Sequence, residues 1–339
     1  MVDENGKSNY DIAKETSETP ETSADQKPSD FKLSVNSYAI ENTIIKYNDK
    51  QGKMALVLSE FNHSGKGDFS EQNVELDTET ATAISFIMDK SSLIKNMHLD
   101  LDAVLAMDLA NNKFSFLKNE AHINQLPLIF NGFVKLKDTT QEVEIDFKTP
   151  SSDFKNFLAL IPEEYSKSIE DVKTTGDFSV LGKINGEISE TTIPKLDIVI
   201  ASNNASFKYP DLPKSVDNIN INVQIKNTTS YLKDTYVAVE KLAFKIDRNE
   251  FNGKIKIENI TENPYINSNI NGTLNLADLN KVYPIEMAKE LSGIITARLS
   301  SSFDMDAITN SKYERIKNNG TLAINKFVFD GDDVANAVK

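Results

Sequence analysis

Apolar and polar side chains alternate along much of this chain with a period of two, and this alternation restricts the possible folds more than any other feature. The clearest example is residues 219–226, where four aliphatic side chains alternate with Asn, Gln and Lys. Successive side chains of a β-strand point to opposite faces of the sheet. The alternation therefore predicts antiparallel strands with one apolar and one hydrated face, because parallel strands buried on both faces would be apolar throughout.

The same pattern occurs in residues 99–108, 142–148 and 241–247. The apolar residues of these four segments are our candidates for the lining of an apolar groove. They are Leu99, Leu101, Leu105, Met107, Val143, Ile145, Phe147, Ile219, Ile221, Val223, Ile225, Leu242, Phe244 and Ile246. The same side chains would form the core of a closed sandwich, and periodicity alone does not separate a closed core from an open trough.

Two short segments have helical spacing instead, and a proline interrupts each of them. They are residues 152–172, interrupted at Pro162, and residues 278–291, interrupted at Pro284. Proline is favourable in the first turn of a helix, so each segment predicts a helix-proline-helix element. Two such elements in a chain of strands indicate an internal duplication.

Three echoes in the sequence accompany this duplication. The tripeptide Phe-Asn-Gly at 130–132 recurs at 251–253, and NTIIKYND at 42–49 is echoed by NASFKYPD at 204–211. A third start is predicted at 320–330, GTLAINKFVFD. Repeated sheet units usually stack into an elongated body.

The resulting organisation has four parts. The first thirty residues are rich in Ser, Thr, Glu, Asp, Lys and Pro, and bury too little apolar surface to offset the entropy of ordering. The predicted parts are a disordered acidic linker at 1–30, a first repeat unit at 31–203 with the helical element 152–172, a second repeat unit at 204–319 with the helical element 278–291, and the start of a truncated unit at 320–339.

The charge and the cysteine count exclude several classes of partner and site. Lys+Arg 37 against Asp+Glu 51 gives a net charge of −14, which argues against nucleic acid as a partner. The absence of cysteine excludes disulfides and thiolate metal sites. No apolar run approaches the roughly 18 residues of a membrane-spanning helix, and residues 1–7 carry no secretory signal. We expect that the chain as given does not span a membrane, and that an export signal lies outside it.

No constellation for catalysis or metal binding is present in the sequence. The three histidines are isolated from further ligands. The pairs Asp100/Asp102 and Asp304/Asp306 lack the remaining ligands of a calcium site, so a hydrated sheet face explains them better. There is no Gly-x-Ser-x-Gly elbow, and Gly65-Lys66-Gly67 fits a hairpin turn. We predict no enzyme activity, no cofactor and no metal.

Several of these segments, in their order and spacing, resemble the AsmA family, specifically the AsmA-like proteins of Bacteroidota-type bacteria. The resemblance covers most of the chain from about Phe31 onward. It rests on residues 42–49 (NTIIKYND), 61–69 (FNHSGKGDF), 152–157 (SDFKNF) leading to Ile161-Pro162, 207–213 (FKYPDLP) and 291–294 (LSGI).

The resemblance implies a bridge-like lipid carrier of the periplasm that takes part in outer-membrane biogenesis. Members of the family have an N-terminal helix in the inner membrane and a long curved sheet with a groove for acyl chains. Phospholipid or another acyl-chain lipid would then be the ligand, and the inner and outer membranes would be reached through parts missing from this chain. The family has no catalytic residues to carry over, and no motif fixes its groove positions.

We therefore predict a mainly β protein: an elongated, curved, mostly antiparallel sheet of imperfectly repeated units that forms a groove, with two short helix-proline-helix elements. Three functions stay open at this point. They are a lipid-binding groove, a structural or adhesive β-repeat module with a closed core and no lipid, and an enzyme whose site the sequence does not reveal.

Overall fold

The computed structural model of this chain describes residues 3, 36–68, 73–88, 91–124, 126–151, 153–158, 171–189, 191–283 and 291–329. The chain divides into two compact units, unit 1 (Met1–Ile123) and unit 2 (Asn124–Lys339). Apart from residue 3, the predicted linker at 1–30 lies outside the described residues, and so do residues 330–339.

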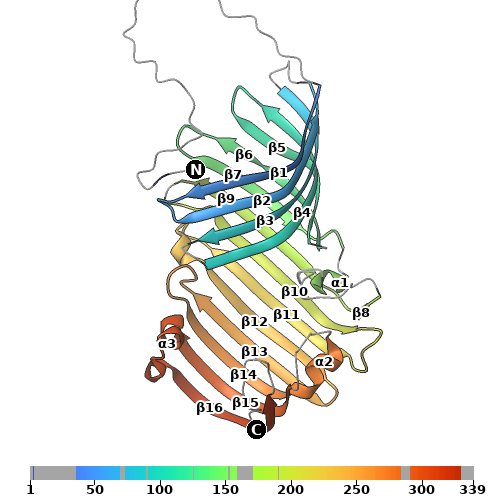
Figure 1. Cartoon of the computed structure of the whole chain (residues 1–339), viewed down its shortest axis with the longest axis vertical. Helices are drawn as coiled ribbons and strands as arrows, with labels where there is room; N and C mark the ends of the chain where they lie inside the picture. Colours follow the sequence, from blue (N-terminus) through green and yellow to red (C-terminus); the bar gives the residue numbers. More distant parts are fainter. Residues whose placement is uncertain are drawn as a thin grey trace, which may run out of the picture. The chain divides into compact units, whose positions relative to one another are not determined.

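The described residues form sixteen β-strands and only a few short helices (Figure 1). The strands pair antiparallel in an open sheet. The predicted fold class, mainly β with antiparallel strands, is confirmed. The sheet does not close on itself, so the closed core that we considered as an alternative is wrong for the described residues.

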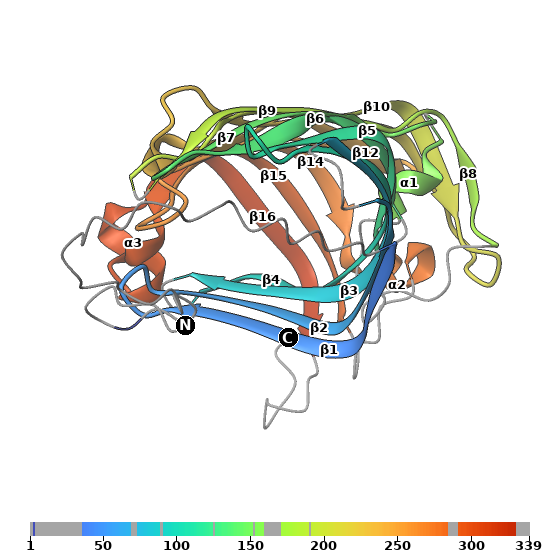
Figure 2. The same ribbon diagram turned by 90° about the horizontal axis from the view of Figure 1, so that it is seen from above.

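In unit 1 the strand order follows the chain, with each strand paired to the next. Figure 2 shows that β1, β2 and β3 bend along their length. The strands are β1 (Ser37–Asp49), β2 (Met54–Lys66), β3 (Asn73–Met88), β4 (Ser91–Asp108) and β5 (Lys113–Ile123).

Unit 2 has the same sequential order, β6-β7-β9-β10-β11-β12-β13-β14-β15-β16, while the short β8 pairs with the end of β10. Its strands are β6 (Leu126–Leu136), β7 (Gln141–Lys148), β8 (Lys173–Thr175), β9 (Ser179–Ile188), β10 (Lys195–Lys208), β11 (Val216–Asn227), β12 (Tyr236–Ile246), β13 (Asn249–Glu258), β14 (Tyr265–Asn275), β15 (Leu291–Asp304) and β16 (Lys317–Phe329).

The helices of unit 2 lie at the ends of its strands (Figures 1 and 2). They are α1 (Lys155–Leu158), α2 (Leu279–Val282) and α3 (Met305–Thr309), with single 3₁₀ turns at Leu232–Asp234, Leu276–Asp278 and Tyr313–Arg315. Helix α1 follows β7 and α2 follows β14, two strands that run in the same direction. Both helices therefore lie on the side of the sheet where these two strands end. These are the first halves of the two predicted helix-proline-helix elements. Most of the second half of each element, including both prolines, lies outside the described residues.

The sequence echoes correspond to equivalent places in the strands. Asn42 in β1, Asn204 in β10 and Lys326 in β16 all have positive φ, at 43°, 48° and 52°. Each lies where the pairing register shifts, as in a β-bulge. The echo of residues 42–49 at 204–211, and the third start at 320–330, therefore begin at or contain the same local distortion of the backbone.

The predicted repeat boundaries do not coincide with boundaries of packing. The compact units divide after Ile123, whereas the boundary at 203/204 lies inside β10 and the one at 319/320 lies inside β16. A sequence repeat can begin within a strand, so the two repeat units stay a prediction about the sequence.

Candidate functional site

One continuous row of apolar positions crosses nine neighbouring strands of unit 2, from β6 to β15. Each member is paired directly with the next, so all of their side chains point to the same face of the sheet. We call them the apolar row: Phe130, Phe147, Gly182, Ile198, Ile225, Val237, Ile257, Ile266 and Phe303.

Further rows on the same face are also mostly apolar, and together they form what we call the apolar face of unit 2. One row joins Val223, Val239 and Ile255, and another joins Leu242 to Leu299 through Gly253 and Ile270. Between the two rows, β12 carries one extra residue, which keeps its apolar side chains on this face despite the register shift.

The opposite face of the sheet is polar beside the same row. Asp146, Lys183, Asp197 and Lys226 are paired in sequence across β7, β9, β10 and β11, with alternating charge. The Nζ of Lys183 lies 3.5 Å from Asp146, and the Nζ of Lys226 lies 3.4 Å from Asp197. Exposed pairs of this kind contribute little to stability. Their main consequence is that this face is hydrated.

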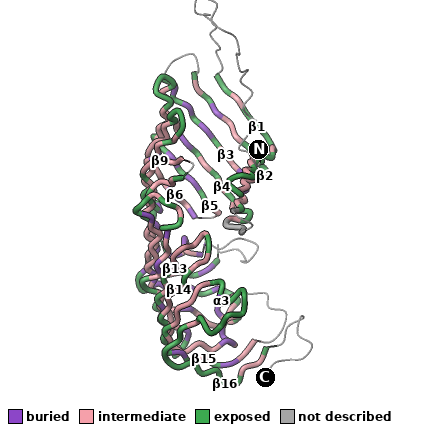
Figure 3. Tube along the Cα trace, turned by 90° about the vertical axis from the view of Figure 1, so that its left-hand side faces the viewer, coloured by how far each residue is buried: buried purple, intermediate pink, exposed green. Residues whose placement is uncertain are grey.

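The apolar row is neither sealed nor fully open to water. All nine of its residues have intermediate exposure, and Figure 3 shows the same intermediate exposure along much of the strands of unit 2. A side chain in a closed core would be almost completely buried, as Phe154 and Phe178 are at 0% exposure. The apolar face is therefore a surface shielded mainly by its own neighbours.

The seven glycines in the described strands of unit 2 all lie on this apolar face. They are Gly132, Gly182, Gly186, Gly253, Gly272, Gly293 and Gly320. The ring of Phe147 lies over Gly182, where a Cβ would come within 2.0 Å of the ring. At Gly253, by contrast, a Cβ would meet only the ring of Phe251, at 3.5 Å. Glycine leaves room for a close approach and lets a sheet bend, so the apolar face has fewer side chains than its alternation suggests.

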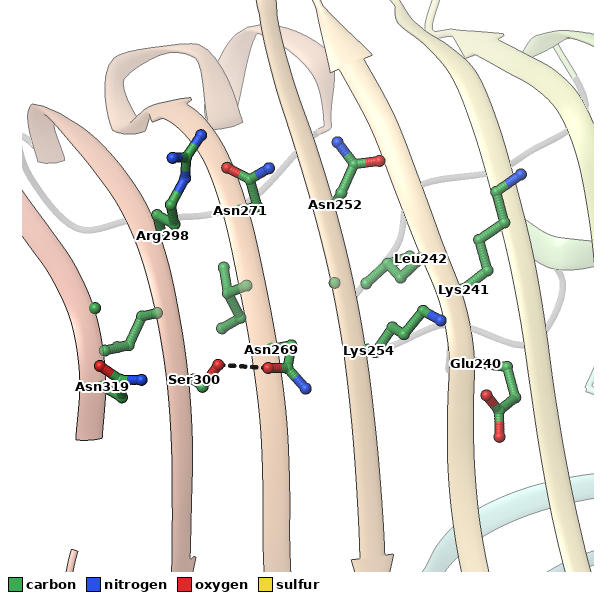
Figure 4. A pocket seen from close by; sticks show the side chains of 14 residues that line it. Glu240, Lys241, Leu242, Asn252, Lys254, Asn269, Asn271, Arg298, Ser300 and Asn319 are labelled. Carbon is green, nitrogen blue, oxygen red and sulfur yellow. Dashed lines mark hydrogen bonds between the residues drawn. The ribbon is translucent and has the colours of Figure 1, made fainter. Parts of the chain in front are cut away.

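A hollow of about 720 Å³ lies over β12 to β16, and most of the residues that line it, among them Asn252, Asn271 and Arg298, belong to the opposite, polar face. Its lining includes Leu242, Gly253, Ile270 and Leu299 of the apolar face. Polar residues of the neighbouring rows complete the lining, and Figure 4 shows them on adjacent strands, with the Oγ of Ser300 donating to the Oδ1 of Asn269.

An aromatic cluster packs at the strand edge that carries α1 and α2. Phe154, which precedes α1, lies with its ring 6.5 Å from that of Phe207 in β10 and 6.4 Å from that of Phe178. Tyr209 continues the cluster, with its ring 5.6 Å from that of Tyr283. Burial, followed by the neighbouring Tyr283, raises the pKa of Tyr209 to about 12.

A buried carboxylate directly precedes α2 in the same region. Asp278 is 2% exposed, and it pairs with the Nζ of Lys214 at 2.8 Å and the Nζ of Lys281 at 3.2 Å. Burial acts to raise the pKa of Asp278, but the hydrogen bonds from the two lysines outweigh it, and the net pKa is lowered. The second acid on Lys214 is the exposed Asp247.

The structure brings all ten candidates of unit 2 onto the apolar face, although not all are equally accessible. Ile219, Ile221, Val143 and Ile246 are buried, at 3% to 7% exposure. The other six, Ile145, Phe147, Val223, Ile225, Leu242 and Phe244, have intermediate exposure. The four buried candidates act as core residues, so only the other six candidates are accessible to a ligand on this face.

The four candidates of unit 1 share one face of β4. Leu105 and Met107 pack in a cluster with Val74 and Leu76, while Leu99 and Leu101 have intermediate exposure. The cluster is a small local core within unit 1. The alternation of residues 99–108 gives no sign of this difference between the two ends of one strand.

Sequence reasoning missed seven of the nine members of the apolar row. The missed members of the apolar row are Phe130, Gly182, Ile198, Val237, Ile257, Ile266 and Phe303. Alternation is visible around several of them, but glycine does not count as apolar in such a pattern. The pairing register, which aligns the strands into one row, has no direct signal in a single sequence.

Two of the polar residues considered above, His63 and Asp304, have local structural partners. His63 hydrogen-bonds through Nε2 to the hydroxyl of Tyr38 at 2.8 Å and through Nδ1 to that of Thr80 at 2.9 Å. Asp304 caps α3 by accepting from the backbone N–H of Ala307, and it pairs with Arg315. Within the described residues, no group of three or more His, Asp or Glu side chains is arranged to hold a metal ion.

Among the described helices, none combines the length and the apolar character needed to cross a membrane. The chain was also compared with family models, with curated proteins and with solved structures, and it matches none of them.

Proposed function

We propose that this chain is a non-enzymatic, lipid-handling segment, and that the apolar face of unit 2 binds acyl chains. In this proposal it is an AsmA-like periplasmic segment that takes part in outer-membrane biogenesis. The observation that carries the proposal is the apolar row, which continues across nine strands and stays partly exposed. Inner-membrane anchoring and contact with the outer membrane belong, in this proposal, to parts outside the chain.

The dimensions of the row suit a lipid chain. Neighbouring strands are about 4.8 Å apart, so eight steps between nine strands make a row about 38 Å long. The hydrocarbon part of a whole bilayer is about 30 Å thick, so one acyl chain spans about half of that. The row is thus long enough for two chains laid end to end. Each methylene removed from water contributes about 0.8 kcal/mol, which favours acyl chains over small polar ligands.

A structural module without a ligand is the second candidate function. The observation in its favour is the local core of unit 1 around Val74, Leu76 and Met107, three buried side chains packed against one another. The partly exposed apolar row of unit 2 argues against it, because a purely structural sheet gains nothing from leaving nine apolar positions in contact with water.

The direct test is native mass spectrometry of the purified chain, read for lipid that stays bound. The informative variant is Gly253→Val, because its Cβ would make only an ordinary van der Waals contact, at 3.5 Å, with the ring of Phe251, its backbone is not at positive φ, and valine favours strands. The added side chain lies on the apolar face, in the row that joins Leu242, Ile270 and Leu299. We expect the variant to fold normally and to retain at least several-fold less lipid.

The matched control is Ala243→Val, which adds a valine on the opposite face, directly beside Asn252 of the next strand. We expect this variant to bind lipid like the parent chain. Absence of lipid from the parent after reconstitution with phospholipid vesicles, or equal binding by Gly253→Val and the parent, would refute the proposal for this face.

A further inference from the structure

The hollow over β12 to β16 lies on the polar face of unit 2, between two rows of side chains that each continue from strand to strand. Residues of the row between them turn their own side chains to the apolar face, so polar side chains form the walls of the hollow. Among the described residues that line it, the polar ones are three cations, four amides, one hydroxyl and one acid. They are Lys241, Lys254 and Arg298, then Asn252, Asn269, Asn271 and Asn319, then Ser300, and finally Glu240.

Two of these cations differ from the lysines elsewhere on the polar face. Lys183, for example, is paired with an aspartate directly opposite it in the next strand. Neither Arg298 nor Lys254 has an ion-pair partner among the described residues. Asn271 lies directly opposite Arg298, and Asn269 lies directly opposite Lys254, so amides stand where an acid stands beside Lys183. In a chain whose net charge is −14, this hollow therefore offers two unneutralised positive charges.

The positive charges of the hollow are spread out rather than gathered at one point. Lys254 in β13 and Arg298 in β15 are two strands apart, which separates their backbones by about 10 Å. Lys241 lies in β12, where the extra residue of the bulge places both Glu240 and Lys241 opposite Lys254. Figure 4 shows that the three cationic side chains do not converge. A phosphate dianion is usually held by several donors at once, so these separate charges fit singly charged groups spaced along a larger ligand better.

A second hollow extends the same polar surface. It has a volume of about 250 Å³, lies over β14 to β16, and shares Asn269, Ser300 and Asn319 with the first. Its lining adds a further cation, Lys317. Four steps between the five strands from β12 to β16 make the combined surface about 19 Å wide. This width suits an oligomer better than a single small molecule.

The uncharged lining narrows the chemistry of that oligomer. Each exposed asparagine offers two donors and an acceptor, which is what hydroxyl groups require. Neither lining includes an aromatic side chain, so a nucleobase or a neutral sugar finds no ring to stack on. Strands β12 to β15 are paired on both sides, so a peptide has no free edge to join there as an added strand.

We propose that this hollow binds an acidic oligosaccharide that carries a carboxylate on successive sugar units. Arg298 and Lys254 bind two of the carboxylates, and the asparagines beside them bind hydroxyl groups. The planar guanidinium of Arg298 matches a carboxylate with two parallel hydrogen bonds. The site lies on the face opposite the apolar face, so this inference does not depend on whether the chain binds lipid.

The test is isothermal titration calorimetry of the whole chain with tetragalacturonate, and with the neutral maltotetraose, which also has four sugar units. We expect tetragalacturonate alone to bind, and to bind less tightly as salt is added, because salt screens exposed charges. Arg298→Gln and Lys254→Gln should each weaken this binding about tenfold, the usual effect of losing a charge-assisted hydrogen bond. Both side chains are exposed, so both variants should fold, which circular dichroism can verify.

The matched control is Lys183→Gln, which removes the same charge from the polar face outside the hollow. It should bind tetragalacturonate like the parent chain. Arg298→Gln should bind lipid like the parent, because its apolar face is unchanged, so this proposal and the lipid proposal can fail separately. A parent chain that does not bind tetragalacturonate, equal binding of maltotetraose or of a tetraglutamate peptide, or equal weakening by Lys183→Gln and Arg298→Gln would overturn the inference.

Discussion

The side-chain oxygen of Asn62 accepts a hydrogen bond from the backbone N–H of Asn42 at 2.9 Å, across the β1–β2 pair. The amide of Asn62 also donates to the carbonyl of Glu60, at 2.8 Å, so a single side chain bridges both sides of a bulge. The same arrangement occurs in unit 2. There Asn220 accepts from the N–H of Asn204 at 3.4 Å and donates to the carbonyl of Asn218 at 2.9 Å.

This bridge predicts that Asn220 stabilises unit 2. Asn220→Ala removes both hydrogen bonds, and a third that its Oδ1 accepts from the Nζ of Lys241 at 3.3 Å, and it leaves two bulge residues at positive φ without their side-chain partner, so we expect the free energy of unfolding to fall by about 1 kcal/mol. Urea denaturation measures it. Asn222 is the control on the same strand, because its Oδ1 is buried and accepts no hydrogen bond from the described residues. Asn222→Ala should lower the free energy of unfolding by less than Asn220→Ala does, or should raise it. A larger loss of stability in Asn222→Ala than in Asn220→Ala would contradict the bridging role of Asn220.

A charge on the apolar row should separate lipid binding from folding. Ile257 has intermediate exposure, so the carboxylate of Ile257→Glu can reach water, and we expect roughly 1 kcal/mol of destabilisation. The variant should stay folded and bind much less lipid, measured by native mass spectrometry. Thr296→Glu places the same group at an exposed position on the polar face and should bind normally. If Ile257→Glu is unfolded, that part of the row is a sealed core.

The buried Tyr209 predicts a loss of stability in strong base. Its pKa in the folded chain is about 12, above the ordinary value of 10.0, so the folded state holds the phenol proton more tightly than the unfolded state. The protonated phenol of Tyr209 therefore contributes fully to the free energy of unfolding below pH 10. This contribution, up to about 2 kcal/mol, is lost as the pH rises from 10 to 12. Tyr209→Phe should flatten the stability profile in this window. An unchanged profile in the variant would mean that other groups cause the alkaline loss.

The buried carboxylate of Asp278 predicts the opposite dependence in acid. Its folded pKa is lowered below 3.8, so its contribution is present above that value and is lost as the pH falls through the folded pKa. Asp278→Asn should lower the free energy of unfolding at pH 7 by about 2 kcal/mol, since both paired lysines retain partial access to water. Asp247→Asn removes the exposed acid from the same Lys214 and should cost well under 1 kcal/mol, by urea denaturation. Equal losses would show that burial of Asp278 is unimportant.

The sequence was sufficient for the fold class, because alternation such as that of residues 219–226 has one simple solution, an antiparallel sheet with two unlike faces. It also indicated that residues 42–49 and 204–211 are equivalent, and the structure then showed a bulge at the start of each, at Asn42 and Asn204. It was not sufficient to grade the candidates. Ile221 and Ile225 occupy equivalent places in the pattern, yet Ile221 is buried at 7% and Ile225 is partly exposed. Contacts from residues distant in the chain decide that difference.

Glycine positions were the other limit. Gly182 interrupts the aliphatic pattern of β9 and was not a candidate, although the ring of Phe147 lies directly over it. A single sequence shows that a glycine is present but not which aromatic side chain of another strand covers it, because that depends on the register between strands. Asn220 illustrates the same limit for polar residues. It reads as an ordinary hydrated position, but its side chain holds a bulge.

The strictly sequential pairing of the strands also determines how this fold forms and how its length can change. In both units each long strand contacts mainly the strands before and after it in the chain, so most backbone pairing closes only a short loop. Folding of this kind has a low contact order for a β protein and can spread from any hairpin to its neighbours. Inserting or deleting a whole hairpin preserves the direction and the facing of every later strand, whereas a change of one strand reverses them. Growth in steps of two strands is therefore the route by which such a sheet becomes longer or shorter without losing its two faces.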